Sequence, residues 1–241
     1  MRCFLALPLP AAARTALGKV AGDLEKSWPS LSWVGPGAYH VTLAFLGELD
    51  EGGRICASEA LATLTEPAIG FRFSGLGGFP PRGPWKVLVA SIVDEPDPQV
   101  DEPGTPGSGG PGATSALHRR LNEALRARER ERGLPPMNPE WPPGKSGRPF
   151  TPHVTLARIR HRVGSPPAGR LPAGRLPAGQ REGSHASAPG PRDLADMRSR
   201  IDSSLAGTWS FDRCVLYSSE LMRGGAKYTE LDQVMLRPGR G

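Results

Sequence analysis

The chain has 241 residues, of which 38% are hydrophobic, with 31 Gly, 27 Pro and a formal net charge of +6. This hydrophobic content is enough for a sizeable core and excludes wholesale disorder, although Gly and Pro together make up about a quarter of the chain, well above their usual share. The basic balance favours an anionic partner such as nucleic acid, and a solvated Arg-rich surface explains the charge equally well.

Gly and Pro are concentrated in three irregular stretches, at 94–114, 134–149 and 163–191, which hold more than half of them. The third stretch contains the pentad Pro-Ala-Gly-Arg-Leu twice in succession from Pro167, a repeat length typical of linkers. We therefore expect a single domain over 1–241, interrupted by three insertions.

The three cysteines, Cys3, Cys56 and Cys214, lie far apart and in no Cys-x-x-Cys spacing. Their number and spacing argue against a disulfide framework and a zinc site, so a cytoplasmic location is expected. The apolar run that ends at Leu9 resembles a short signal peptide, but Pro10 after it favours a buried strand followed by a helix. No apolar run approaches the roughly 20 residues of a membrane span, and no membrane partner is expected.

Hydrophobic periodicity and turn residues predict elements along the whole chain. Before the first insertion they are a strand at 2–9, a helix at 11–27, a strand at 39–46, a helix at about 53–65, and strands near 68–75 and 85–93. After it come a helix capped by Thr114 or Ser115 and ending at Gly133, a strand at 152–160, a helix at about 194–205 closed by Gly207, and strands near 208–217 and 227–236 around a Gly224-Gly225 turn.

After the first strand, the order helix, strand, helix, strand, strand occurs twice, so the chain is expected to contain two copies of one unit. This order predicts an α+β fold of two pseudo-symmetric lobes, each a small, mainly antiparallel sheet with helices on its outer face. We expect the active-site cleft between the lobes.

Both copies carry the pentapeptide His-Val-Thr-Leu-Ala, beginning at His40 and at His153. Because side chains alternate along a strand, each His shares a face with the Thr two residues later, Thr42 or Thr155. Two facing imidazoles can act as one acid and one base, and the hydroxyls can donate hydrogen bonds to a phosphate. A lone His-x-Thr is usually structural, but its repetition favours a functional pair. No Asp, Glu or Cys accompanies the pair at ligand spacing, so no metal or other cofactor is expected.

The segments that begin His40-Val-Thr-Leu and His153-Val-Thr-Leu resemble the two signature motifs of the two-histidine (2H) phosphoesterases. Within that superfamily the chain is similar to the LigT/ThpR-type RNA 2′,3′-cyclic phosphodiesterases, formerly called 2′-5′ RNA ligases. The similarity extends to the start of the chain, to segment 40–48 and to the closing segments 217–221 and 225–228. It leaves out the three insertions.

This resemblance implies metal-independent hydrolysis of RNA 2′,3′-cyclic phosphate ends to 2′-phosphates, with His40 as proton donor and His153 as proton acceptor. It also implies that Thr42 and Thr155 hold phosphate oxygens and that Arg158 occupies a position able to contact phosphate. Strict alternation puts Arg158 on the face opposite His153, so that role requires a bulge or a strand end, and a solvated charge is an equal alternative.

Two aromatic residues, Phe45 and Tyr228, are candidates for stacking on a base. Core packing is the better explanation for Phe45, which would share a face with Val41 and Leu43 by alternation. For Tyr228 both roles stay open.

Two other functions also stay open: 2′-5′ ligation of RNA ends by reversal of the same chemistry, and noncatalytic binding of RNA ends. The expected partner is an RNA or nucleotide with a 2′,3′-cyclic phosphate. A monomer is favoured, although the sequence does not fix the oligomeric state.

Overall fold

The computed structural model describes residues 1–81, 85–95, 112–138, 140–141, 150–159, 205–222 and 225–237. The third insertion and most of the other two lie outside these residues, as does the helix expected at about 194–205. The predicted limits of the domain and of its insertions therefore stay predictions.

The described elements follow the expected order. They are β1 (Arg2–Pro8), α1 (Ala11–Ser27), β2 (Ser32–Trp33), η1 (Pro36–Ala38), β3 (His40–Glu48), α2 (Glu51–Ala62), β4 (Ile69–Phe79), β5 (Val87–Asp94), α3 (Ala113–Arg132), β6 (His153–Arg158), β7 (Trp209–Phe211), β8 (Arg213–Met222) and β9 (Gly225–Met235). Strands and helices expected within the described residues are confirmed, with ends shifted by a few residues. The short elements β2 and η1 are additional, and the strand expected at 208–217 is divided between β7 and β8.

The predicted cap of α3 is wrong. The N-cap residue is Gly112, and Thr114 lies inside the first turn. There its backbone N–H donates to the Asp94 carboxylate at 2.9 Å, and its hydroxyl donates to the other oxygen of the same carboxylate. An acidic group from the end of β5 thus replaces a local cap at the positive end of the helix. Gly133 ends α3 in the left-handed conformation, at φ 64°, as expected.

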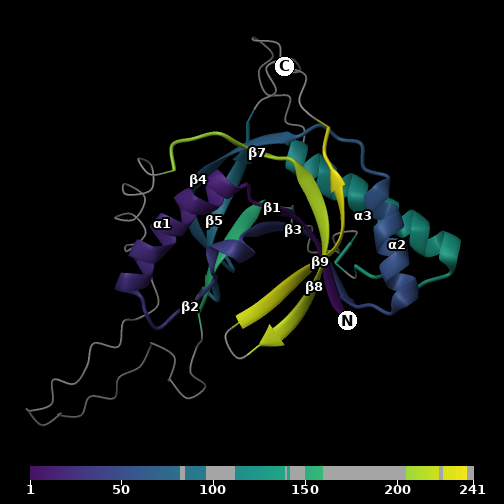
Figure 1. Ribbon diagram of the computed structural model, residues 1–241, viewed down its shortest axis with the longest axis horizontal. Helices are drawn as coiled ribbons and strands as arrows, with labels where there is room; N and C mark the ends of the chain where they lie inside the picture. The colour runs from purple at the N-terminus through teal and green to yellow at the C-terminus, as the bar shows by residue number, and fades with distance from the viewer. Residues whose placement is uncertain are drawn as a thin grey trace, which may run out of the picture.

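The strands form one sheet of nine, in the order β7-β4-β5-β6-β3-β1-β8-β9, with β2 beside β6 (Figure 1). All pairs of named strands in the described part of the chain are antiparallel, and β3 meets β6 at the pair Val41 and Val154. The predicted α+β class and antiparallel pairing are confirmed. The division into two lobes stays a prediction, since the two halves belong to one continuous sheet.

Pairing between strands joins the two copies. β6 of the second copy lies between β5 and β3 of the first. β7 of the second copy likewise pairs with β4 of the first. Each half of the sheet therefore contains strands from both copies, which ties the two copies together.

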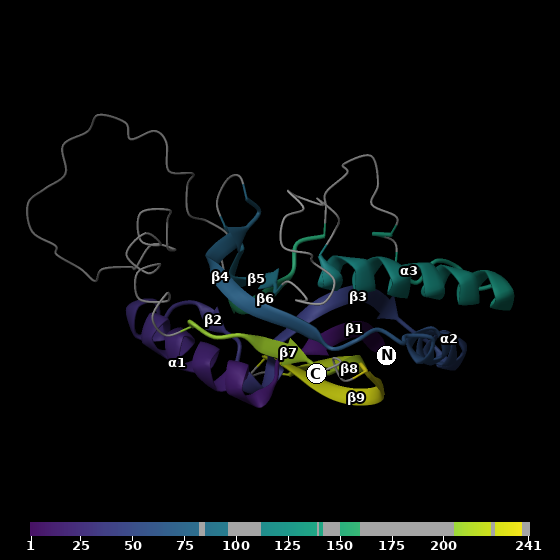
Figure 2. The ribbon, with the colours of Figure 1, turned by 90° about the horizontal axis from the view of Figure 1, so that it is seen from above.

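The helices lie against one face of the sheet, and the other face carries the repeated motif. In β1, Leu5 and Leu7 join the main core, whereas Phe4 and Ala6 belong to a separate small cluster on the opposite face. Figures 1 and 2 show α2 and α3 side by side, with α1 on the far side of the molecule. Within the described residues, no helix has the length and apolar character needed to cross a membrane.

Candidate active site

The two copies of the His-Val-Thr-Leu-Ala motif lie on neighbouring strands, β3 and β6, at the centre of the sheet. Val41 and Val154 are paired and almost completely buried on the helix side. In an antiparallel pair, the neighbours of such a pair point to the opposite face, and each residue there faces a partner across the strands. His40 is therefore placed opposite Thr155, and His153 is correspondingly opposite Thr42.

This arrangement puts two imidazoles and two hydroxyls on one face, with all four side chains half-buried. His40 and His153 are diagonal neighbours, for which ordinary cross-strand geometry gives a separation of about 7–8 Å between backbone positions. We call His40, Thr42, His153 and Thr155 the quartet.

Both motif strands contain a β-bulge at the same residue of the repeat. In β3, Ala6 is opposite Thr42 and Leu5 is opposite Ala44, which leaves Leu43 unpaired. In β6 the same slip leaves Leu156 unpaired. Since an extra residue reverses the alternation beyond it, the bulge changes the face of the side chains that follow, as far as a second bulge at Leu46 in β3.

The bulges explain where Phe45 and Arg158 lie. On β5, Ser91 is opposite His153 and Val87 is opposite Arg158. Ser91 and Val87 lie four residues apart and share a face, so Arg158 shares the face of His153. The bulge that this position requires is therefore present. Phe45 is opposite Phe4 and is 58% exposed, so the expectation that it packs in the core is wrong. Strict alternation predicted the wrong face for Phe45 because no feature of the sequence marks the extra residue of a bulge.

Each catalytic candidate is held by the same local hydrogen bond. Nδ1 of His40 lies 2.8 Å from the carbonyl oxygen of Ala38, and Nδ1 of His153 lies 2.8 Å from that of Thr151. Because a carbonyl only accepts, the proton resides on Nδ1 in both rings. In the neutral ring, Nε2 is then left with a lone pair available to a ligand.

Aromatic rings surround His40. The ring centroid of His40 is 4.9 Å from that of Phe4, 5.3 Å from that of Tyr228 and 6.4 Å from that of Tyr217. Phe79 takes a similar place beside His153, at 4.7 Å. Tyr228 therefore packs perpendicular to the His40 ring. The sequence alone had left both of its possible roles open.

The surroundings of His40 change its titration. Burial lowers the pKa of His40 to about 4, the Ala38 carbonyl opposes this, and the nearby charges of His153 and Arg158 lower it further. His40 is therefore neutral near pH 7 in the free protein. The effect of Arg158 also shows that its guanidinium lies within electrostatic reach of the quartet.

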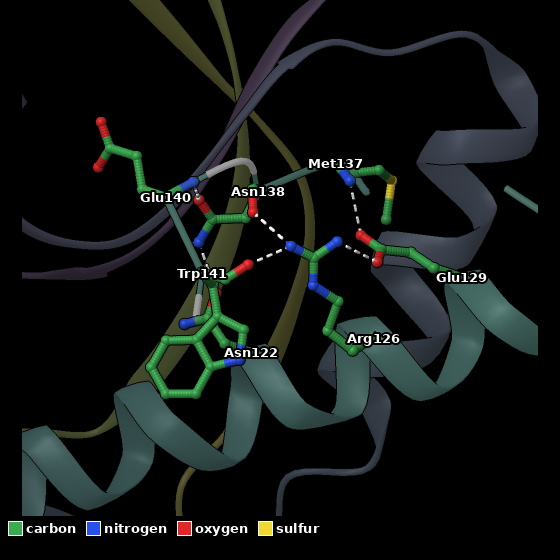
Figure 3. Close-up of polar contacts among 7 residues, drawn as sticks. All are labelled: Asn122, Arg126, Glu129, Met137, Asn138, Glu140 and Trp141. Atoms are coloured by element: carbon green, nitrogen blue, oxygen red, sulfur yellow. Dashed lines mark hydrogen bonds and ion pairs between the residues drawn. The ribbon is translucent and has the colours of Figure 1, made fainter. Parts of the chain in front are cut away.

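A buried polar network on α3 was missed by the sequence analysis (Figure 3). The guanidinium of Arg126 donates to Glu129 at 2.9 Å, to the carbonyl of Asn138 at 2.9 Å and to the carbonyl of Trp141. The other carboxylate oxygen of Glu129 accepts from the backbone N–H of Met137 at 2.7 Å. This ion pair fixes the chain that follows α3.

The same network reaches the bulge in β3. Asn122 is 1% exposed, and its carbonyl oxygen accepts from the Asn138 amide at 2.6 Å. Its own amide donates to the carbonyl of His118 at 2.7 Å and, in a longer contact of 3.4 Å, to that of Leu43. The spacing of His118, Asn122 and the later polar residues at helical intervals beside the leucine stripe was the signal that could have revealed it.

A third histidine, His118, has a packing role on α3. Its ring stacks on Phe150 with centroids 4.0 Å apart and rings nearly parallel, and burial lowers its pKa to about 4. Phe150 directly precedes Thr151, whose carbonyl holds His153. His118 therefore supports the entry to β6. The described residues contain no group of three or more His, Cys, Asp or Glu side chains placed to hold a metal ion.

Comparisons with known proteins identify similar sequences. Residues 7–89 match the family model of LigT-like phosphoesterases. A curated RNA 2′,3′-cyclic phosphodiesterase of Geobacillus stearothermophilus is 29% identical over 157 residues, which are 64% of this chain and 41% of that protein. This chain therefore matches less than half the length of that relative.

Solved structures support the fold over nearly the whole chain. A crystal structure from Thermus thermophilus superposes with a TM-score of 0.59 and 24% identity, covering 100% of both chains. The crystal structure of Escherichia coli LigT without ligand gives a TM-score of 0.54 and 20% identity, covering 98% of this chain and 97% of that one. The α+β fold expected from the sequence is the fold of these proteins.

Proposed function

We propose that this chain, whose residues 7–89 match the LigT-like phosphoesterase family model, hydrolyses RNA 2′,3′-cyclic phosphate ends to 2′-phosphates by two-histidine acid–base catalysis. The name of the Geobacillus relative supports this substrate, and a structure of E. coli LigT in complex with 3′-AMP supports a nucleotide ligand. The observation that carries the proposal is the quartet, because its two identical His-Thr pairs lie on one face with both Nδ1 atoms anchored.

The reaction is an attack by water on phosphorus. Nε2 of His153 accepts a proton from the water as its oxygen bonds to phosphorus, and His40 donates a proton from Nε2 to O3′ as the P–O3′ bond breaks. Thr42, Thr155 and Arg158 donate to the nonbridging oxygens, where negative charge accumulates in the transition state. The products are a 2′-phosphate and a 3′-hydroxyl, and no step requires a metal ion.

The donor role of His40 requires it to hold a proton when the substrate is bound. The lowered pKa in the free protein reflects burial and the positive charges around the ring. The negative charge of a phosphate anion between the two histidines raises the pKa of His40, so the substrate itself favours the protonated form of His40. Binding and protonation of the catalytic acid are thereby coupled.

Phe45 is the candidate for base stacking. Its ring is exposed and lies on the site face, 6.5 Å from that of Phe4. Tyr228, by contrast, is partly buried against His40 and helps orient that imidazole. The base of the terminal nucleotide then stacks on Phe45, while the cyclic phosphate occupies the quartet.

Turnover of 2′,3′-cyclic AMP in excess EDTA tests the proposal. Hydrolysis to 2′-AMP should survive EDTA, and His40→Ala and His153→Ala should each lower kcat by about 10²- to 10⁴-fold. His118→Phe is the matched control, because it removes a histidine outside the quartet and keeps an aromatic ring on Phe150; its kcat should stay near wild type. Turnover that survives either quartet substitution would contradict the assigned roles.

The same preparation separates the two alternative functions. Ligase activity would join an RNA 2′,3′-cyclic phosphate to a 5′-hydroxyl RNA end in a 2′-5′ linkage, which product analysis detects. A noncatalytic binder would bind RNA ends in a salt-dependent way, without turnover and without an effect of the quartet substitutions.

A further inference from the structure

A surface hollow of about 470 Å³ lies between α1 and η1. Its lining comes from these two elements and consists of Ala11, Arg14, Thr15, Gly18, Lys19, Pro36 and Gly37. The lining holds two cations and no acidic residue.

Gly18 allows the two walls of the hollow to approach. A Cβ atom on Gly18 would lie 2.9 Å from Cγ of Pro36, closer than side chains normally come. Glycine inside a helix costs about 1 kcal/mol relative to alanine, and its presence here is explained by this close approach of η1 to the helix.

The two cations of the hollow are not neutralised within the described part of the chain. Lys26, near the end of α1, pairs with Asp23 at 2.7 Å, whereas neither Arg14 nor Lys19 forms an ion pair there. Arg14 and Lys19 lie five residues apart, about 7.5 Å along the helix axis and about 140° around it. That spacing suits successive anionic groups along a chain better than one compact anion.

The hollow adjoins the quartet. Gly37 in its wall is followed by Ala38, whose carbonyl holds Nδ1 of His40. On its other side, Arg14 lies within electrostatic reach of Tyr217: burial raises the pKa of Tyr217 to about 12, and Arg14 is among the charges that oppose this rise. These two observations place the hollow on the side of His40.

We propose that Arg14 and Lys19 bind the phosphodiester backbone of the RNA on the 5′ side of the reacting nucleotide. The inference rests on the proposed function and deepens it: the hollow makes an RNA strand, rather than a free cyclic mononucleotide, the preferred substrate. Phosphate contacts of this kind position a strand without reading its sequence.

The test compares two substrates, 2′,3′-cyclic AMP and a ten-nucleotide RNA ending in an adenosine 2′,3′-cyclic phosphate. The double variant Arg14→Ala/Lys19→Ala should lower kcat/KM for the RNA about tenfold or more and leave kcat/KM for the mononucleotide within twofold of wild type. For a single strand, each lost phosphate contact reduces the slope of log affinity against log salt by about 0.7, so the slope should fall by about 1.4. Lys26→Ala/Arg130→Ala removes the same charge elsewhere and should change neither substrate.

Three results would overturn the inference: an equal loss for both substrates, an equal loss in the control double variant, or no loss for the RNA. If the wild-type protein hydrolyses neither substrate, the proposed function fails and the hollow is tested by binding alone. The same RNA with a 3′-phosphate, followed by fluorescence anisotropy, should then bind more weakly to the Arg14→Ala/Lys19→Ala variant, with the same change in salt slope. Unchanged binding would overturn the inference independently of catalysis.

Discussion

Two equivalent positions of the repeat, Phe45 and Arg158, carry different side chains. Both come directly after His-Val-Thr-Leu-Ala, beyond the bulge at its Leu, and both lie on the face of the quartet. The repeat thus supplies a symmetric pair of imidazoles and hydroxyls, while the residue after each pentapeptide makes the site asymmetric. An aromatic ring at one position and a cation at the other suit a ligand with a base at one end and a phosphate at the other.

Arg158→Gln tests whether this cation belongs to the site or is a solvated surface charge. Because its charge contributes to the lowered pKa of His40, the substitution should raise that pKa, which stays below its ordinary value since burial persists. NMR titration of the imidazole measures this. The loss of a donor to the transition state should also lower kcat by about 10²-fold. Arg72→Gln on β4, where the side chain pairs with Glu95, should change neither; a solvated Arg158 would behave in the same way.

At the scale of elements, α3 connects the two motif strands. Through Asn122 it reaches the carbonyl of Leu43 at the bulge of β3, and through His118 it packs on Phe150, just before β6. The two contacts are one turn apart on the same helix. A buried polar network in which every group has a hydrogen-bond partner fixes one arrangement more strictly than apolar packing does. Such rigidity is useful for β3 and β6, because the side chains of the quartet must be positioned accurately relative to one another.

Asn122→Leu should disturb both stability and catalysis. The variant leaves the Asn138 amide and the Leu43 carbonyl without their partner, and each buried unsatisfied group costs about 1–3 kcal/mol. Urea unfolding should therefore show a free energy of unfolding lowered by at least about 2 kcal/mol, and kcat should fall while KM changes little. Ala124→Leu, at a partly buried apolar position of α3, is the comparison for a bulky change on the same helix. An unchanged kcat in folded Asn122→Leu protein would assign the network to stability alone.

For the whole molecule, the repeat was the part that the sequence could predict. The identical pentapeptides at His40 and His153 predicted two equivalent strands, and the shared face of each His with its Thr follows from alternation. The bulges at Leu43 and Leu156 could not be predicted, because any residue can be the extra one and only pairing with β1 and β5 reveals it. For the same reason the position of Phe45 was wrong. The exchange of strands between the copies is likewise set by long-range pairing, which local patterns do not encode.

The stability of the whole protein should depend on pH through two buried histidines. Burial lowers the pKa of His40 and of His118 to about 4, whereas both titrate near 6.5 in the unfolded chain. Below pH 6.5 the unfolded state binds protons that the folded state does not, so stability present above that pH is lost progressively as the pH falls towards 4. At pH 5 His40 removes about 2 kcal/mol, a large part of the 5–15 kcal/mol typical of a domain, and the more exposed His118 removes less.

Urea unfolding at pH 7 and pH 5 measures this loss. His118→Phe keeps the stack on Phe150 and removes one of the two groups, so the difference in unfolding free energy between the two pH values should be smaller than that of wild type. An equal difference in both proteins would show that His118 takes up its proton as readily in the folded state as in the unfolded one. A phosphate ion bound in the quartet should reduce the part due to His40, since an anion there favours the protonated ring in the folded state. The same interaction that prepares His40 as the catalytic acid would then also protect the fold against acid.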